Sequence, residues 1–253
     1  MRRALARAAA AALVLWGTAA CGSGSAEPDD RTLTVFAAAS LAPALTEIAR
    51  DFEDRHEGVD VRLSFGGSSA LAAQLLDGAP ADVFAAADER TMARVQQDGP
   101  AELSPVVFAT NTLLLVVPAD NPVNVASVDD LSGEGVKVVL CAEQVPCGAA
   151  SRRLLQDTGT PVDPVSEEQS VSDVLGKVAN GQADAGLVYR TDALAAGERV
   201  RSIEIPGASE VVNRYPIAAV GGPERSALAA EFVRFVSGGE ARTVLAAAGF
   251  GTP

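Results

Sequence analysis

Apolar residues in the first third of the chain follow two alternating patterns. Residues 32–39, TLTVFAAA, are rich in β-branched and aromatic residues and predict a strand. In residues 41–56 the large apolar side chains recur at spacings of three and four, which predicts a helix with one apolar face. Residues 59–65, 71–78 and 81–87 then predict a strand, a short helix and a strand. This βαβαβ order predicts a parallel sheet with helices on its faces.

The rest of the chain continues the alternation. Further apolar strands are predicted at 112–118, 136–141, 185–189 and 215–222. Further helices are predicted at 148–159, 170–181, 224–238 and 239–249. We expect an α/β fold of two lobes, with lobe 1 formed by residues 33–110 plus 216–253 and lobe 2 by residues 111–215. Two hinge-crossing segments would then join the lobes, with a ligand cleft between them at the carboxyl ends of strands.

The N-terminus has the layout of a secretory signal peptide. Three arginines precede an apolar run from Ala8 to about Trp16, and small residues then lead to Cys21. The alternative is a transmembrane anchor, but the apolar run is shorter than the roughly 20 residues that a span requires. We therefore expect residues 1–20 to be a cleaved leader and the protein to be exported.

Cys21 has a further interpretation as a lipidation site. A cysteine after small residues, followed by the flexible GSGSAEPDD, resembles a bacterial lipoprotein signal. Residues 21–31 would then be a lipidated cysteine and its tether, with the protein on the outer face of the cytoplasmic membrane, held by lipid alone. Simple secretion into the periplasm is the alternative, because Thr18 stands where lipoprotein signals prefer an apolar residue.

The two remaining cysteines, Cys141 and Cys147, are separated by five residues. In an exported chain such a pair favours a disulfide over a thiol site. A zinc site would need about four ligands, and the chain has a single histidine, His56. We expect a disulfide and no metal held directly by protein ligands.

Charge narrows the choice of partners. The formal net charge is −13, and removal of the leader takes away three arginines and no acids. Such an acidic surface argues against nucleic acid as a partner.

Enzyme motifs are missing from the sequence. There is no phosphate loop ending in GK[ST], no HExxH and no GxSxG, and no His or Lys falls in a strand–helix turn. Asp82 and Asp88 are interpreted as caps or surface charges, and the pairs 129–130 and 167–168 as solvated loop acids. We expect no catalytic residues.

One local arrangement recurs: a strand ends in a small or polar residue and a helix starts at once. It occurs at Ser40, at residues 66–68, at Cys147 and near Val171. The first N–H groups of a helix lack intrahelical partners, carry partial positive charge and bind anions. Several such ends around one cleft would hold a small oxyanion, although each serine alone could be an ordinary N-cap.

At these residues the sequence resembles a known family. The segments VFAAASL (35–41), 64–88 with GAPADVF, VPCG (145–148), GLVY (186–189) and YPIAAV (215–220) are similar to the molybdate-binding proteins of bacterial molybdate ABC importers. The resemblance runs from about residue 33 to the end. It implies a two-lobed periplasmic-binding-protein fold of type II.

The resemblance also implies a ligand set of hydroxyl and backbone N–H donors: Ser40, Ser68, Cys147, Val171 and Tyr189. Ser69 is the next candidate after Ser68, and a neighbour of Val171 is the alternative for that backbone donor. Cys147 would act through its N–H, so its side chain need not match that of relatives. Tyr189 would offer its phenol hydroxyl, and a core tyrosine is the alternative.

The implied function is capture of molybdate, and also tungstate, without a cofactor. A monomeric protein would deliver the anion to a membrane permease driven by a cytoplasmic ATPase. The alternatives are a binding protein for another tetrahedral oxyanion such as sulfate, an enzyme on a similar two-lobed fold, and the effector domain of a regulator.

Overall fold

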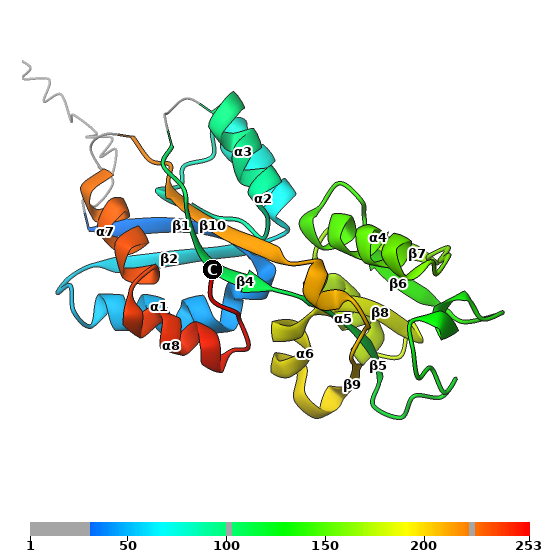
Figure 1. Ribbon diagram of the computed structural model, residues 1–253. Helices are drawn as coiled ribbons and strands as arrows, with labels where there is room; N and C mark the ends of the chain where they lie inside the picture. Colours follow the sequence, from blue (N-terminus) through cyan, green and yellow to red (C-terminus); the bar gives the residue numbers. More distant parts are fainter. Residues whose placement is uncertain (1–30, 100–102, 223–225) are drawn as a thin grey trace, which may run out of the picture.

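The computed structural model describes residues 31–99, 103–222 and 226–253, which form two lobes, each built on a five-stranded sheet (Figure 1). The first sheet contains, in spatial order, β2 (Asp60–Gly66), β1 (Thr32–Ala38), β3 (Val83–Ala85), β10 (Asn213–Ala219) and β4 (Val106–Asn111). The second contains β7 (Ser166–Glu168), β6 (Val138–Cys141), β8 (Ala185–Tyr189), β5 (Leu113–Pro118) and β9 (Val200–Ile203). The predicted two-lobed α/β fold is confirmed. The leader, Cys21 and the tether up to residue 30 lie outside the described residues.

Helices cover both sheets. The first sheet carries α1 (Ala42–Glu53), α2 (Ser68–Leu76), α3 (Glu89–Asp98), α7 (Ser226–Val236) and α8 (Gly239–Ala247). The second carries α4 (Pro146–Thr158), α5 (Val171–Ala179) and α6 (Arg190–Ala196). Figure 1 shows α1 and α8 on one side of the first sheet and α2 and α3 on the other.

Strand direction follows the predicted order where the chain alternates regularly. β1 pairs in parallel with both β2 and β3, as the βαβαβ pattern predicts. β10 is antiparallel to β3 and to β4, because it enters the sheet from the other lobe. The carboxyl ends of β1 and β2 therefore open toward the second lobe.

Two short segments connect the lobes. The chain leaves the first sheet after Asn111 and starts β5 at Leu113; it leaves β9 at Ile203 and returns in β10 at Asn213. Asn111 and Asn213 are partners in the β4–β10 register. Both crossings are thus adjacent, which places the hinge at one edge of the interlobe contact.

Several elements were not predicted, and each carries a weak apolar signal. In α3 only three of ten residues are buried, so its apolar stripe is narrow. α6 has seven residues and β7 has three, which is too short for a periodic pattern to emerge. β4 and β9 expose part of their length. The expected start of α4 at residue 148 is wrong, because the helix begins at Pro146, where a proline lacks only an N–H that the first turn does not use.

The single histidine has a structural environment. His56 stacks on Phe52 with ring centroids 3.9 Å apart, and its Nε2 lies 3.1 Å from a Glu231 carboxylate oxygen. Phe52 in turn packs edge-on against Phe232, which joins α1 to α7. Within the part of the chain that the structure describes, no group of three or more His, Cys, Asp or Glu side chains is placed to hold a metal ion.

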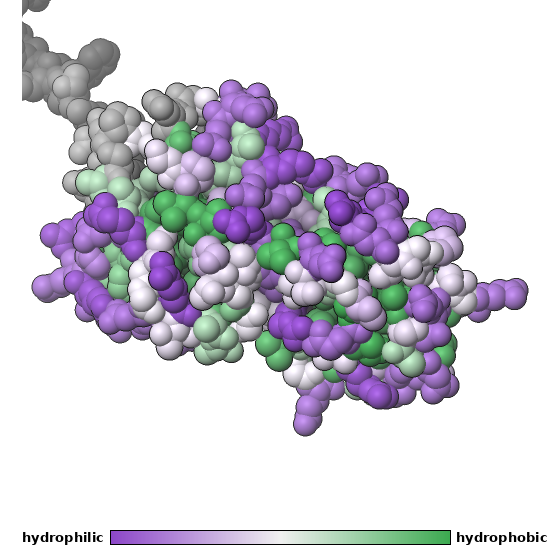
Figure 2. All heavy atoms as spheres, in the orientation of Figure 1, coloured by the Kyte–Doolittle hydropathy of each residue, from purple (hydrophilic) through white to green (hydrophobic). Residues whose placement is uncertain are grey.

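The hydropathy of one face and of the helices bears on whether the chain could span a membrane. The side shown in Figure 2 is mainly hydrophilic, with hydrophobic residues in small, separated patches. Among the described residues, no helix combines the length and apolar character that crossing a membrane requires.

Candidate functional site

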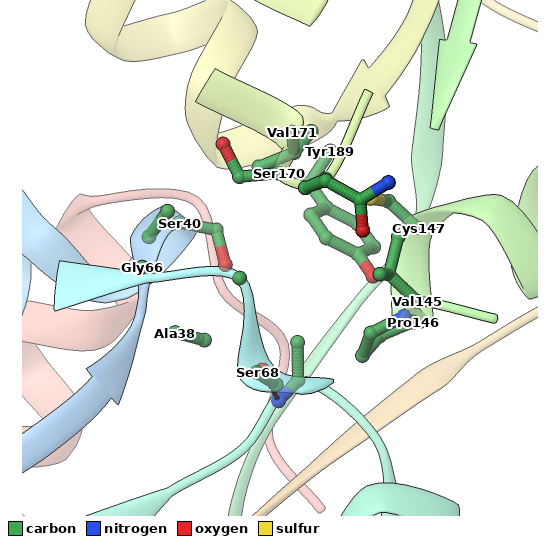
Figure 3. A pocket seen from close by; sticks show the side chains of 14 residues that line it. Ala38, Ser40, Gly66, Ser68, Val145, Pro146, Cys147, Ser170, Val171 and Tyr189 are labelled. Carbon is green, nitrogen blue, oxygen red and sulfur yellow. Dashed lines mark hydrogen bonds between the residues drawn. The ribbon is translucent and has the colours of Figure 1, made fainter. Parts of the chain in front are cut away.

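A small cavity lies between the lobes, and all five predicted ligand residues line it (Figure 3). Its volume is about 20 Å³, on a measure in which one water requires roughly 10–15 Å³. It is therefore sized for one compact ion rather than for an organic molecule. None of the fourteen described residues that line it has a charged side chain.

The first lobe contributes two buried serines. Ser40 lies in a 3-10 turn, Ala39–Leu41, directly after β1, and Ser68 is the first residue of α2 after β2. The Ser40 hydroxyl is 2.9 Å from the hydroxyl of Tyr215, and the Ser68 hydroxyl accepts the N–H of Ala87 at 3.0 Å. Both side chains are nearly inaccessible to solvent, so each hydroxyl is held in place.

The second lobe contributes two helix N-termini. Cys147 lies in the first turn of α4, ahead of the first helical hydrogen bond from Ala149 N to Val145 O. Its sulfur forms a disulfide with Cys141 at the end of β6, which confirms the predicted pairing. Val171 is the first residue of α5. The N–H groups of both first turns are therefore not used within the helices.

Ser170 is a lining residue that sequence reasoning did not select. It is the N-cap of α5, and its hydroxyl accepts the Asp173 N–H at 3.3 Å and donates to the Asp173 carboxylate at 2.7 Å. Its oxygen is thus engaged by the helix, as expected for an N-cap.

Tyr189 ends β8 and contributes a phenol hydroxyl. Its side chain is buried, and its oxygen receives a hydrogen bond from Asn213 Nδ2 at 3.0 Å. Burial raises the pKa of Tyr189 well above its usual value, so the hydroxyl stays protonated and able to donate. The sequence left two alternatives for Tyr189, a core residue or a residue of the ligand site. In the structure its side chain is buried and also lines the cavity.

The polarity of the cavity comes from dipoles. Helices α2, α4 and α5 and the 3-10 turn at Ser40 all begin at its wall. Helix N-termini carry a partial positive charge, and hydroxyl and N–H groups supply hydrogens. An anion would gain hydrogen bonds there, whereas a cation would face the positive ends of the helix dipoles. The geometry therefore favours a small anion.

The two lobes touch each other beside the cavity. Ser69 Oγ and Arg90 Nη2 donate to the backbone oxygen of Gln144, at 3.0 and 3.2 Å. Ser69, the second candidate after Ser68, is absent from the cavity lining and instead bridges the lobes. Gly67 lies so close to the second lobe that a Cβ there would be 2.1 Å from the Gln169 backbone oxygen. These contacts describe a closed arrangement.

The acids singled out from the sequence lie away from the cavity lining. Asp88 is the N-cap of α3 and accepts the Thr91 N–H at 2.8 Å, as predicted. Asp82 is buried and accepts the Thr34 N–H at 2.7 Å, which corrects the interpretation of it as a surface charge. Its carboxylate instead joins β3 to β1.

In the pairs at 129–130 and 167–168, three of the four acids are exposed, as predicted, and Glu168 is half-buried. The Asp130 carboxylate accepts the N–H groups of Ala126 and Ser127, which lowers its pKa. Glu168 lies in β7 and pairs with Lys177. Both acids therefore have structural partners.

A buried acid behind Tyr189 was missed. Asp192 is 7% exposed and accepts the Tyr189 N–H at 3.1 Å. Burial raises the pKa of Asp192 to about 7. Nothing in the local sequence distinguishes this aspartate from an exposed helix acid.

Comparisons with known proteins agree with this geometry. Residues 33–251 match the family of bacterial extracellular solute-binding proteins. A molybdate-binding protein ModA of Mycobacterium tuberculosis is 46% identical over 249 residues, covering 96% of this chain and 95% of the relative. The periplasmic molybdate-binding protein of Azotobacter vinelandii superposes with a TM-score of 0.73 at 23% identity, covering 87% and 99% of the two chains. The sulfate-binding protein SubI of Mycobacterium tuberculosis gives 0.73 at 22% identity, covering 87% and 86%, which is a likeness of fold.

The contact at Gly67 generates a test of lobe closure. Gly67→Ala should keep the lobes apart, because its Cβ would overlap the Gln169 oxygen, while the backbone angles at residue 67 suit alanine. Gly66→Ala is the matched control, since its Cβ would be 3.5 Å from Leu71, an ordinary contact. Small-angle scattering with excess molybdate should show a larger radius of gyration for Gly67→Ala only. Equal radii for both variants would contradict the assignment of this contact to closure.

Asp192 generates a prediction about pH and stability. Its folded-state pKa of about 7 lies above the ordinary aspartate value near 3.9, so the folded protein holds this proton more tightly than the unfolded chain. Its contribution to stability is complete below about pH 4 and is lost as the pH rises through 7. Asp192→Asn keeps an acceptor for the Tyr189 N–H and removes the titration.

Urea denaturation between pH 4 and 8 measures the effect. The free energy of unfolding of the wild type should fall relative to that of Asp192→Asn by up to roughly 4 kcal/mol. Parallel pH profiles of the two proteins would show that Asp192 does not titrate in this range.

Proposed function

The chain belongs to the bacterial extracellular solute-binding proteins and, within them, to the molybdate-binding family, and from this premise we propose that it captures molybdate for an ABC importer. One observation carries the proposal: a cavity sized for a compact ion, whose described lining consists of hydroxyls, helix N-termini from both lobes and other uncharged residues. Tungstate has the same charge, shape and nearly the same size, so the proposal extends to it.

The proposed ligand set is the one named from the sequence. Ser40, Ser68 and Tyr189 would donate through hydroxyls, and Cys147 and Val171 through backbone N–H groups. Support comes from their shared position on the cavity wall, three of them at helix starts. Hydrogen bonds to a charged group contribute roughly 1.5–3 kcal/mol each, so five donors suffice for tight binding without a cation.

Binding would coincide with lobe closure. We take the lobes as residues 33–110 with 216–253 and residues 111–215, hinged at the adjacent crossings. An anion between them would add donors from both sides to the bridges at Gln144. The proposed role needs no bond-making chemistry and no cofactor.

The proposed partners follow from the family. A membrane permease with its cytoplasmic ATPase would take the anion from the closed protein, and nucleic acid has no part in this cycle. The leader at 1–20 would direct export, and a lipid on Cys21 would keep the monomeric protein at the outer face of the cytoplasmic membrane.

The first test is a comparison of anions by calorimetry. Wild-type protein should bind molybdate and tungstate more tightly than sulfate or phosphate. Ser40→Ala and Ser68→Ala should each weaken molybdate binding by about 10- to 100-fold, the loss of one hydrogen bond to a charged group. Ser64→Ala, at an exposed position of β2, is the control and should leave affinity unchanged.

Two outcomes would count against the proposal. Tight binding of sulfate with no heat from molybdate would reassign the ligand to the alternative oxyanion. Unchanged molybdate affinity in both serine variants would remove Ser40 and Ser68 from the site.

The disulfide generates a second test. It holds the first turn of α4 on the end of β6, with the two Cα atoms 5.7 Å apart. Replacing both Cys141 and Cys147 with alanine should cost roughly 2 kcal/mol of stability, the chain-entropy effect of so short a loop. Molybdate binding should remain measurable but weaker, because the Cys147 N–H is kept while its position is less restrained.

Calorimetry and urea denaturation of the double variant measure both effects. Complete loss of binding in a folded double variant would show that sulfur contributes more than restraint. Unchanged affinity for molybdate would show that the disulfide does not organise the site.

A further inference from the structure

The three hydroxyls proposed as ligand donors share one feature: each is already engaged by a second group. Ser68 Oγ accepts the Ala87 N–H at 3.0 Å, and the Tyr189 oxygen receives Asn213 Nδ2 at 3.0 Å. Ser40 Oγ lies 2.9 Å from the Tyr215 hydroxyl, where either oxygen could be the donor. A hydroxyl has one hydrogen, so the direction of these contacts decides whether that hydrogen is available to a ligand.

At Ser68 and Tyr189 the direction is determined by backbone groups. The Ala87 N–H can only donate, so Ser68 Oγ is the acceptor and keeps its hydrogen. Asn213 Nδ2 also lies 2.9 Å from the Ala87 backbone oxygen, which can only accept. The amide nitrogen, not the amide oxygen, must therefore face this side, and it donates to the Tyr189 oxygen as well.

The backbone of Ala87 thus connects one cavity hydroxyl of the first lobe with one of the second. Its N–H engages Ser68 of the first lobe, and its oxygen fixes Asn213, which engages Tyr189 of the second lobe. Asn213 is the first residue of β10, beside the hinge.

At Ser40 the direction of the hydroxyl hydrogen depends on Asn111 and Tyr215. Asn111 Oδ1 accepts the Thr112 N–H at 3.0 Å, which directs Nδ2 to the other side, where it donates to Thr191 Oγ1 at 2.9 Å. Asn111 also hydrogen-bonds the Tyr215 hydroxyl. Asn111 occupies one lone pair of the Tyr215 oxygen, and in the arrangement where Tyr215 donates to Ser40 Oγ the Ser40 hydrogen is left for the cavity.

Tyr215 is well suited to this task. Its ring is fully buried and packs edge-on against Tyr189 and Phe250, with centroids 5.9 and 5.3 Å away. Burial raises the pKa of Tyr215, so it remains a neutral donor. Its hydroxyl also contacts that of Tyr189 and can accept the Tyr189 hydrogen until a ligand does.

We propose that Asn111, Asn213 and Tyr215 are positioning residues that fix the direction of the hydroxyl hydrogens, so that Ser40 and Tyr189 present hydrogens, not lone pairs, to the ligand. This inference rests on the proposed function. A cavity of oriented donors accepts a fully deprotonated oxyanion such as molybdate. It discriminates against hydrogen phosphate, because the proton of that ion would face a hydroxyl hydrogen instead of a lone pair at Ser40 and Tyr189.

A double-mutant cycle tests the Tyr215 branch. Tyr215→Phe keeps the ring and removes the hydroxyl, and it should weaken molybdate binding about tenfold by calorimetry. In a Ser40→Ala background the same change should weaken binding less than about twofold, because Tyr215 acts through Ser40. Equal losses in both backgrounds, or no loss in either, would overturn this branch. Melting temperatures establish that each variant is folded.

Asn213→Asp tests the other branch and stands even where Tyr215→Phe fails to fold. A carboxylate accepts the Tyr189 hydrogen and turns lone pairs toward the ligand, so the ratio of molybdate to phosphate affinity should fall by about tenfold or more. A charge effect alone would weaken both anions by the same factor, and that result would overturn the proposal. Failure of the wild type to bind any of the oxyanions would instead refute the proposed function.

Discussion

The binding site rests on one electrostatic constraint. In the proposed function it holds an anion with dipoles alone, without a positively charged side chain beside it. The chain carries a formal net charge of −13, and the described residues that line the cavity are uncharged. Surface charges are screened beyond about 10 Å in moderate salt, so the acidic exterior acts weakly on the cavity. Oriented dipoles act strongly there, because the enclosed site has a lower effective dielectric than water. That balance requires the donors within each lobe to be oriented before the ligand arrives, so that closure only brings the two sets together.

The fold meets this requirement by bringing strand ends and helix starts to one point. β1 and β2 deliver Ser40 and Ser68 from the first lobe, and β8 delivers Tyr189 from the second. The disulfide fixes the start of α4 relative to β6. Closure then brings the two halves together, with Gly67 leaving room for the Gln169 backbone to approach.

In the proposed mechanism the hinge has a chemical role as well as a mechanical one. Asn111 and Asn213 are register partners in β4 and β10 at the two crossings, and their amides donate to the hydroxyls of Thr191 and Tyr189 in the second lobe. In the proposed mechanism, the segment about which the lobes move also determines which atoms of the site face the ligand. Specificity and closure would then share the same few side chains.

The sequence by itself determined the α/β class, the two lobes and the cysteine pair by local signals, and the five residues on the cavity wall through the resemblance to a known family. The spacing of apolar residues indicates strands and helices, and a small or polar residue such as Ser40 indicates a strand–helix turn. Family resemblance assigned roles to Cys147 and Val171, whose side chains carry no donor suited to an anion. Helices α3 and α6 were not predicted, because α3 buries only three of its ten residues and α6, with seven residues, is too short to show a periodic pattern.

Only the tertiary structure decided how these residues act together. Ser40 and Tyr215 are 175 positions apart, and Ala87 and Asn213 are 126 apart, so no local pattern relates them. The burial that raises the pKa of Asp192 likewise comes from packing around α6, because the local sequence resembles that of an exposed helix acid. A hydrogen bond has a direction that depends on both partners and on their other contacts. The direction of the donors at the site is therefore a property of the folded chain.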